Sequence, residues 1–398
     1  MPNLGEFMRR TVSSSVEMGT TPVETAYEAF RAARRFPGLD GLRALSILLV
    51  LTSHMHDPVW SFFAGGFGVT IFFGISGFLI TTLLLREEDR HGRVSLKNFY
   101  IRRVFRILPM YFLALALTIV LVLGLGLGEG GSNFLERLPL LATFNGEFAG
   151  SGTFSHSWSL GIEEKFYIIW PLLAFGLLPI RNRLGAVLAV AVPAAAVMSY
   201  VPWTGYIGVY FPILGGCALA VAMHSRRSFA FAFALSGRWA GTLAFIAMIA
   251  MLGLNRYLPF QDQSNYAHVA FAVFALLAMP GILIGDGWQR KILSLPPVVY
   301  YGNLAYGIYL FHPFVGDVID RAIPAGQSSL LLAGVRFAGM IVVSFAVAWV
   351  LRVSVEQPMI RFGRRLTSRT PRPGQVESDP VRSVSRRDKR VRSAQQGR

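Results

Sequence analysis

The chain has 398 residues, of which 53% are hydrophobic and 15% are charged, and its formal net charge is +16. A soluble globular domain carries about 25% charged residues, so this composition excludes an ordinary soluble protein and indicates one that crosses a membrane several times. Nucleic-acid binding is not indicated either, because the basic residues lie between apolar runs and at the chain ends, without an RNA- or DNA-binding module around them. The single cysteine, Cys217, excludes a disulfide framework and a cysteine metal site; no metal cluster is visible.

The N-terminal region, residues 1–37, is predicted to be a cytoplasmic tail that contains one short amphipathic helix. Thr21 is a suitable N-cap, Pro22 follows at the first helical position, and Glu24 stands three residues after the cap. This pattern is a capping box, which predicts a helix that starts at Pro22.

Apolar runs long enough to cross a hydrocarbon core of about 30 Å follow from residue 42 onward. The segments between them that are rich in Lys and Arg alternate with poorly basic segments, which places both termini in the cytoplasm. The sequence therefore predicts an all-α, polytopic helical bundle in the cell membrane with about ten spans. The expected spans are 42–60, 66–85, 108–128, 159–179, 184–201, 206–223, 234–254, 267–285, 298–318 and 329–351.

These spans form one transmembrane domain, expected over residues 38–360, and a basic tail follows over residues 361–398. The tail is rich in Ser, Pro, Arg and Gln, which is a composition typical of disorder. We expect it to be cytoplasmic and weakly attracted to anionic lipid head groups.

The first span carries two polar side chains, Arg43 near its start and His54 deep inside it, in "LDGLRALSILLVLTSH". A helical rise of 1.5 Å per residue separates them by roughly 16 Å, and eleven residues are almost three turns, so both side chains project from nearby faces. They are predicted to line one cavity. The alternative is that Arg43 anchors the helix at the interface and His54 is an interhelical hydrogen-bonding residue.

The third span begins with "FYIRRVFRILPMYF", in which Arg103 and Arg106 share a helix face. Two guanidinium groups on one face suit phosphate groups. The preference for positive residues at the cytoplasmic end explains the same arginines equally well.

The fourth span, "SHSWSLGIEEKFYIIWPLL", carries Glu163, Glu164 and Lys165 near its outer end. Adjacent helical residues point about 100° apart, so one glutamate is expected to face the cavity and the other to pair with Lys165 or an interfacial group. A cavity-facing glutamate at the depth of His54 is expected to orient that imidazole for general-base catalysis. The alternative is an ordinary structural pair.

Aromatic residues near these groups are expected to contact the substrate. Tyr306, Tyr309 and His312 fall on one face of the ninth span in "YGNLAYGIYLFHPFV". Such a stripe is also typical of simple packing, and His312 before Pro313 is equally suited to a cap or a kink. The predicted substrate-binding residues are Trp158, Tyr167, Tyr306 and His312.

Taken together, six segments resemble the acyltransferase-3 family of integral membrane O-acyltransferases. They are "LDGLRALSILLVLTSH", "GGFGVTIFFGISGFLITTLLL", "FYIRRVFRILPMY", "SWSLGIEEKFYIIWPLL", "YGNLAYGIYLFHPFV" and "VEQPMIRF", in this order from residue 39 to residue 362. Thr70 and Ala305 depart from the residues that are usual in the family, an acidic residue and a serine. Some relatives append an extracytoplasmic SGNH domain, and this chain is expected to be a stand-alone member without one.

The resemblance implies the transfer of an acyl group from cytoplasmic acyl-CoA to a hydroxyl of a carbohydrate or a glycosylated small molecule. The acyl group is commonly acetyl in the family and is expected to be acetyl here. It implies that Arg43 and His54 are required for activity, and that Arg103 and Arg106 form the R-x-x-R pair. We expect Arg43, Arg103 and Arg106 to bind the CoA phosphates, and His54 to act as general base with Glu163 or Glu164 in a direct transfer. A route through a covalent acyl-histidine is the alternative mechanism. A proton-coupled transporter of an anionic or sugar solute is the alternative. The sequence gives no indication of oligomeric state.

Overall fold

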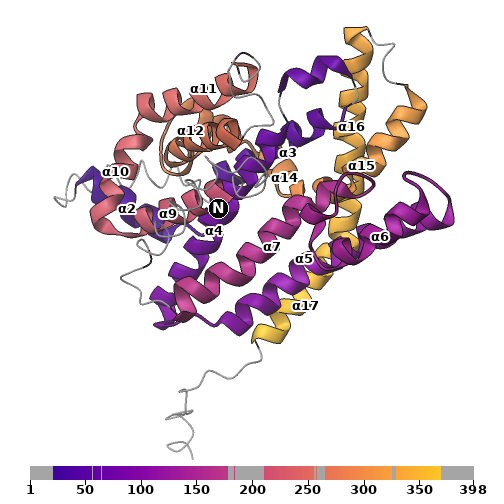
Figure 1. Ribbon diagram of the computed structural model, residues 1–398. Helices are drawn as coiled ribbons and strands as arrows, with labels where there is room; N and C mark the ends of the chain where they lie inside the picture. Colours follow the sequence, from indigo (N-terminus) through magenta and orange to yellow (C-terminus); the bar gives the residue numbers. More distant parts are fainter. Residues whose placement is uncertain are drawn as a thin grey trace, which may run out of the picture.

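The computed structural model describes residues 21–55, 57–63, 65–177, 183, 210–254, 257, 265–324 and 329–368. Within these ranges the elements are all helices, and Figure 1 shows them packed as one bundle, with α4 running through its middle. The principal helices are α2 (Pro22–Ala32), α3 (Pro37–Ser53), α4 (Gly66–His91), α5 (Leu96–Ile119), α6 (Gly131–Ala142), α7 (Trp158–Pro171), α9 (Tyr210–His224), α10 (Arg226–Ser236), α11 (Arg238–Leu254), α12 (Asn265–Leu283), α13 (Trp288–Leu293), α14 (Pro296–Gly302), α15 (Ala305–Ala322), α16 (Leu330–Leu351) and α17 (Gln357–Ser368).

Short segments complete several of these helices. The 3-10 helices are η1 (Pro58–Phe63), η3 (Gly146–Phe148) and η4 (Ser155–Ser157), and the π-helical turns η2 (Val120–Gly124), η5 (Leu172–Leu177) and η8 (Arg352–Glu356) follow α5, α7 and α16.

Three described helices are long and apolar enough to cross a membrane, namely Gly66–His91, Leu96–Gly124 and Leu330–Ser368. The number rises to five if each bent pair, α2 with α3 (70°) and α10 with α11 (71°), counts as one span. Two shorter apolar helices, Tyr210–His224 and Ala267–Leu283, are also present. A helical protein with several candidate spans is therefore confirmed, and the count of about ten and the orientation of the termini stay predictions.

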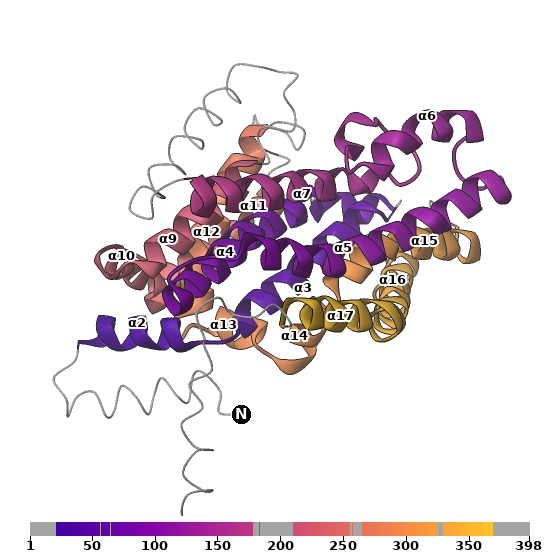
Figure 2. The same ribbon diagram turned by 90° about the horizontal axis from the view of Figure 1, so that it is seen from below.

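The predicted N-terminal helix is present as α2. The Thr21 side chain accepts a hydrogen bond from the Glu24 backbone N–H at 3.3 Å, as the capping pattern predicts. Arg86 of α4 donates to the carbonyl groups of Phe30 and Ala33, at the end of this helix. These bonds fasten α2 to the bundle, and Figure 2 shows it beside the ends of α4 and α10.

Two predicted spans are wrong in extent. The run 42–60 is not one helix, because α3 ends at Ser53 and η1 begins only at Pro58. The hydroxyls of Thr52 and Ser53 donate to the Leu49 and Val50 carbonyl groups and so occupy acceptors of the last turn. The run 298–318 is broken between α14 and α15, where Arg352 donates to the Asn303 carbonyl.

The start of the predicted tail is also corrected. Helix α17 continues to Ser368, so residues 361–368 are helical and pack with α5, beside which α17 lies in Figures 1 and 2. The Phe362 ring contacts the Phe105 ring at 5.1 Å between centroids. The predicted span 184–201 and the rest of the tail lie outside the described residues.

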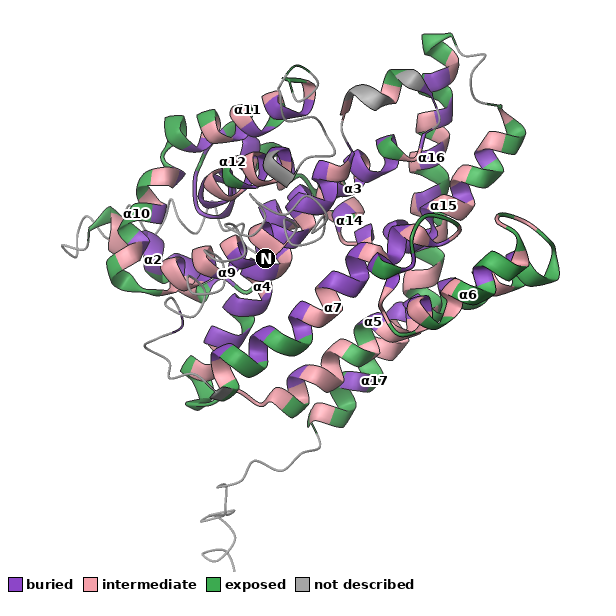
Figure 3. Cartoon of the chain, in the orientation of Figure 1, coloured by how far each residue is buried: buried purple, intermediate pink, exposed green. Residues whose placement is uncertain are grey.

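Buried side chains form two apolar cores on either side of α3 and α4. One core includes Met110 of α5, Ile162 of α7 and Ile308 of α15. The other includes Phe30 of α2 and Phe271 of α12, together with residues of α9 to α11. In Figure 3 buried residues are concentrated on α3 and α4, and exposed residues are frequent on α6, α10, α11 and α17.

Glycines allow α4 and α9 to pack at backbone distance. A Cβ atom at Gly77 would collide with the Ile213 carbonyl, and one at Gly216 would collide with the Gly74 carbonyl. Small residues at helix interfaces are a common means of close packing between membrane helices. Cys217 lies at this interface, where it is completely buried.

A buried ion-pair group ties α16 to two other parts of the chain. Arg336 of α16 is completely buried and pairs with Asp320 of α15. Its second partner is Asp57, at 3.4 Å, which lies between α3 and η1. The group holds the segment that follows His54 against the C-terminal helices.

Candidate active site

A cavity with a volume of about 130 Å³ lies between the helices that carry the predicted site residues. Its walls come from α3, α4, α5, α7, α14, α15 and η8, segments that lie far apart in the sequence. The polar and charged residues that line it are Arg43, Ser76, Arg103, Arg106, Ser159, Glu163, Glu164, Tyr167, Asn303, Tyr306, Tyr309 and Glu356.

Three arginines from two helices line this cavity. Arg43 of α3 pairs with Asp40, one helical turn earlier, at 3.0 Å. Arg103 of α5 lies over the Tyr167 ring, 4.9 Å from its centroid, and so is held by a cation–π contact. Arg106 lies close enough to Glu356 for the two charges to interact. Gathered in one cavity, the three guanidinium groups form a site suited to an anionic ligand.

Glu163 and Glu164 of α7 both line the cavity, although the sequence analysis expects only one of them to do so. The Glu163 carboxylate accepts hydrogen bonds from the Ser76 hydroxyl at 2.7 Å and from the Tyr167 hydroxyl at 3.0 Å. These bonds fix Glu163 against α4. These hydrogen bonds do not involve His54. In the described part of the chain, the structure therefore gives no hydrogen bond by which Glu163 would orient the His54 imidazole, as the sequence predicts of one glutamate.

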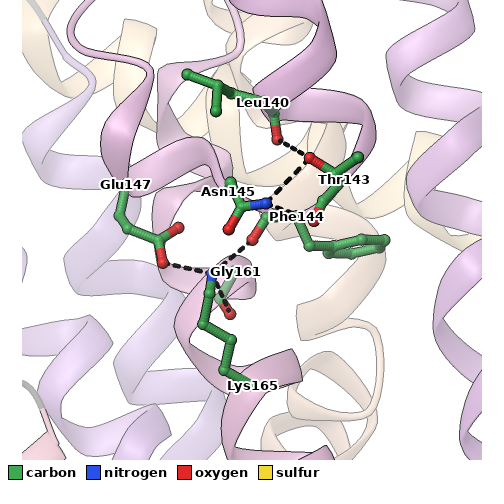
Figure 4. A network of polar contacts seen from close by, with 7 residues as sticks. All are labelled: Leu140, Thr143, Phe144, Asn145, Glu147, Gly161 and Lys165. Atoms are coloured by element: carbon green, nitrogen blue, oxygen red, sulfur yellow. Dashed lines mark hydrogen bonds and ion pairs between the residues drawn. The ribbon is translucent and has the colours of Figure 1, made fainter.

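Lys165 pairs with Glu147 and not with Glu163 or Glu164, which corrects the expected pairing. Figure 4 shows Lys165 reaching η3 and the residues just before it, where its Nζ donates to Glu147 Oε1 at 2.5 Å and to the Phe144 carbonyl at 2.9 Å. In the same network the Asn145 amide donates to Thr143. Lys165 therefore fastens the loop before α7, and both glutamates remain available to the cavity.

His54 is the C-cap of α3 and does not lie inside a longer helix. Its Nδ1 is 2.9 Å from the Val50 carbonyl oxygen, which can only accept. Nδ1 therefore carries the hydrogen, and Nε2 is the basic nitrogen of the neutral ring. The carbonyl thus fixes the orientation and tautomer that general-base chemistry requires.

His54, His156 and His312 form what we call the histidine cluster. The ring centroids of His54 and His312 are 4.3 Å apart, and those of His156 and His312 are 5.3 Å apart. Both contacts are edge-on. His156 comes from η4 and His312 from α15, so the cluster joins three elements.

Tyr309 links the cavity to the histidine cluster. It lines the cavity, and its hydroxyl lies 2.5 Å from both the Ser159 hydroxyl and the His156 carbonyl oxygen. Since a carbonyl only accepts, Tyr309 donates to His156 and accepts from Ser159. Its ring is 5.7 Å from His156 and 5.8 Å from His312, so Tyr309 lies between the cavity and the cluster.

The structure brings together most of the predicted site. Arg43, Arg103, Arg106, Glu163, Glu164, Tyr167 and Tyr306 line the cavity, whereas His54, His312 and Trp158 are not among its lining residues. His54 and His312 instead meet in the histidine cluster, and Trp158 packs on Phe73 at 6.2 Å.

Six polar residues of this region are not predicted from the sequence as site residues, namely Ser76, His156, Ser159, Asn303, Tyr309 and Glu356. Ser76 stands in an apolar run, and Ser159 and His156 flank a tryptophan without any spacing pattern to mark them. Tyr309 is part of an aromatic stripe that packing explains equally well. Glu356 lies at a π-helical turn, and the sequence gives no signal for such a turn.

The described part of the chain contains no group of three or more His, Cys, Asp or Glu residues placed to hold a metal ion. The polar groups of the cavity and the cluster are instead those of acid–base chemistry and of anion binding: guanidinium groups, carboxylates, hydroxyls and imidazoles.

Comparison with known proteins gives one family. Residues 36–353 match the family described as "Acyltransferase domain". The chain is 33% identical over 321 residues to "Putative peptidoglycan O-acetyltransferase YrhL" of Bacillus subtilis (strain 168), which covers 72% of this chain and 49% of that protein. It is 31% identical over 315 residues to "Peptidoglycan O-acetyltransferase OatA" of Listeria monocytogenes serovar 1/2a, covering 71% and 50%. The chain thus spans about half the length of these curated relatives. No solved structure matches it.

Proposed function

The chain belongs to the acyltransferase-3 family, and from this premise we propose that it transfers an acetyl group from cytoplasmic acetyl-CoA to a hydroxyl of a carbohydrate, with His54 as general base. The observation that carries the proposal is the cavity itself: three arginines and two glutamates of the predicted site line one space, and Tyr309 in its wall contacts the histidine cluster.

The donor binds through the cation side of the cavity. Arg43, Arg103 and Arg106 hold the CoA phosphates by charge-assisted hydrogen bonds, for which the planar guanidinium group is well suited. The cation–π contact of Arg103 with Tyr167 holds its guanidinium group in place before the donor arrives. The pantetheine arm then points along the cavity toward Tyr309.

The transfer takes place beside His54. Neutral His54 accepts at Nε2 the proton of the attacking hydroxyl as the hydroxyl oxygen bonds to the thioester carbonyl carbon. The C–S bond breaks, and the leaving CoA thiolate takes the proton from His54. Val50 holds the ring through Nδ1 during both steps. Glu163 and Glu164 contact the substrates from the cavity wall, and Tyr167 and Tyr306 shape the same wall.

The acceptor is proposed to be a carbohydrate of the cell envelope. The relatives from Bacillus subtilis and Listeria monocytogenes bear names that refer to peptidoglycan O-acetylation, which makes peptidoglycan fragments the first acceptors to test.

The test is release of CoA thiol from acetyl-CoA by membranes that contain the wild type or His54→Ala, with envelope glycans supplied as acceptors. General-base assistance contributes a factor of about 10² to 10⁴ in rate, so His54→Ala should insert normally and lose nearly all turnover. His268→Ala is the matched control, because His268 of α12 bonds to Thr70 and lies outside the cavity and the cluster.

Wild-type turnover in His54→Ala would contradict the role of His54. If the wild type released no thiol with any acceptor despite verified insertion, acyl transfer would be rejected. Uptake of labelled solute without consumption of acetyl-CoA would then identify a transporter.

A further inference from the structure

Two members of the histidine cluster have a buried ring nitrogen to which the described residues offer no hydrogen-bond partner. These atoms are Nε2 of His156 and Nε2 of His312. His156 is 8% exposed and His312 is 0% exposed, so bulk water does not solvate their side chains freely. A buried polar atom without a partner costs about 1–3 kcal/mol. Two such atoms in one cluster require a physical explanation.

Both atoms are hydrogen-bond acceptors. The Nδ1 atom of His312 lies 2.7 Å from the Tyr309 carbonyl oxygen, so Nδ1 carries the hydrogen. The unpartnered nitrogen of His156 is also Nε2, and its ring lies close to the backbone of Leu310. In a neutral imidazole with one N–H, the other nitrogen carries a lone pair. The partner that each Nε2 lacks is therefore a donor, such as a hydroxyl group.

The segment just before His156 has a strained backbone, and a hydrogen bond holds it in place. Phe154, two residues earlier, has a φ of 66°, and among the described residues only Phe144 is another non-glycine with positive φ. Such a conformation costs about 1–3 kcal/mol and persists only where the surrounding structure enforces it. Here the Tyr309 hydroxyl holds the His156 carbonyl at 2.5 Å. The loop thus stores strain to bring an imidazole into the bundle.

A metal ion would also use nitrogen lone pairs, but the cluster does not provide its ligands. No group of three or more His, Cys, Asp or Glu in the described ranges is placed to hold one. Two nearby hydroxyls, those of Ser159 and Tyr309, are committed elsewhere, since Ser159 donates to Tyr309 and Tyr309 donates to the His156 carbonyl.

We propose that His156 and His312 form the acceptor subsite, in which each Nε2 accepts a hydrogen bond from a hydroxyl of the sugar that His54 deprotonates. The proposal rests on the proposed function and adds to it the groups that select a hydroxyl-rich acceptor. A sugar carries neighbouring hydroxyls, so one can face His54 while others bond to His312 and His156. The ligand class is therefore a polyol or carbohydrate, and an acceptor with a lone hydroxyl binds less tightly.

The test compares His156→Leu, His156→Gln and the control His268→Leu as purified full-length protein in lipid nanodiscs. Acetyl transfer to chitotetraose is measured over a range of chitotetraose and of acetyl-CoA concentrations. The Kd of chitotetraose is measured by calorimetry without donor. Loss of one hydrogen bond, about 0.5–1.5 kcal/mol, raises the acceptor KM and Kd of His156→Leu about two- to twelvefold.

The donor KM of His156→Leu stays at the wild-type value, because the arginines that hold the donor are untouched. His156→Gln restores acceptor binding, because the Gln carbonyl oxygen accepts a hydrogen bond in place of Nε2. His268→Leu behaves as the wild type in every measurement.

Two results would overturn the subsite and leave acyl transfer standing: a wild-type acceptor KM and Kd in His156→Leu, or an equal rise of donor and acceptor KM that His156→Gln does not restore. The second result would assign His156 to packing. A wild type that neither transfers acetyl nor binds acetyl-CoA would instead reject the proposed function, and the subsite with it.

Discussion

Arg103 and Arg106 have different surroundings although one helical turn separates them. Arg103 lies between the Phe99 and Tyr167 rings, 5.6 Å and 4.9 Å from their centroids. Arg106 lies close enough to Glu356 for their charges to interact, and Arg352 also interacts with the Glu356 carboxylate. The positive-inside preference explains neither arrangement, because a topology signal requires charge and not a specific contact. This difference favours the reading in which both arginines bind a ligand.

Replacing both arginines, in Arg103→Ala with Arg106→Ala, is expected to raise the KM for acetyl-CoA by about tenfold or more, since each charge-assisted hydrogen bond contributes about 1.5–3 kcal/mol. The turnover number at saturating donor should change less. Steady-state kinetics over a range of donor concentrations measures the two separately.

A matched control for charge alone is Arg361→Ala with Arg364→Ala on α17, which has the same i, i+3 spacing and does not line the cavity. An unchanged donor KM in the Arg103 and Arg106 variant would contradict donor binding by these arginines. It would leave them as residues that only set the orientation of the helix in the membrane.

At this scale the sequence identifies charged residues well and hydrogen-bonding residues poorly. An arginine or glutamate in an apolar run is conspicuous because its burial is costly, so Arg43, Arg103, Arg106, Glu163 and Glu164 were predictable. Ser76 and His156 were not, because their positions depend on contacts between helices. The partner of Lys165 was mistaken for the same reason: Glu147 approaches it only through a folded loop.

Helix ends in this protein are set by side chains that compete for backbone groups. The start of α2 was predictable because the capping box acts within three residues. The end of α3 was not, because Thr52, Ser53 and His54 each bond to a carbonyl of their own helix and stop it inside an apolar run. Hydropathy measures the run and does not detect this competition.

The contact between α4 and α9 depends on glycine, which leads to a prediction about stability. Gly77→Ala places a Cβ against the Ile213 carbonyl, and backbone atoms cannot move aside as a flexible side chain can. Overpacking of this kind costs about 1–3 kcal/mol or more. We expect a lower melting temperature in detergent for Gly77→Ala, measured by tryptophan fluorescence or scanning calorimetry.

The matched control is Gly334→Ala on α16, where an added Cβ meets no atom within 4 Å. It should keep the wild-type melting temperature or exceed it slightly, since alanine favours the helix by up to about 1 kcal/mol. Equal effects of the two substitutions would contradict the packing argument.

The molecule as a whole places the proposed chemistry between its N-terminal and C-terminal helices. The cavity needs α3 from the start of the chain and α15 and η8 from its end, so no half of the sequence contains the site. The all-helical class was predictable from composition and hydropathy. The pairing of helices that are distant in the sequence was not predictable. Apolar side chains indicate that a helix is buried or faces lipid, but they do not identify the helix that packs against it.

The orientation of the chain across the membrane can be tested by labelling introduced cysteines, because the chain has a single cysteine of its own. Cys217 is the single cysteine and is completely buried, so the wild type should react little with a membrane-impermeant maleimide. Ser151→Cys lies in a loop that the charge distribution places outside, and His91→Cys lies at the end of α4, which the charge distribution places inside. Intact cells should label the first, and the second should label only after permeabilisation. The reverse pattern would invert the predicted topology.

The buried arginine of α16 has a consequence for how the protein is made. An unpaired arginine at the centre of a helix opposes membrane insertion by about 2.5–3.5 kcal/mol. Arg336 finds its partners in Asp57 and Asp320, which are synthesised before it. Helix α16 can therefore reach its final position only after the earlier part of the chain has positioned these two carboxylates. Biogenesis thus acquires a checkpoint: a nascent chain whose first helices are misplaced leaves Arg336 of α16 without Asp57 and with Asp320 as its one partner in the pair of carboxylates, a form that membrane quality control can recognise.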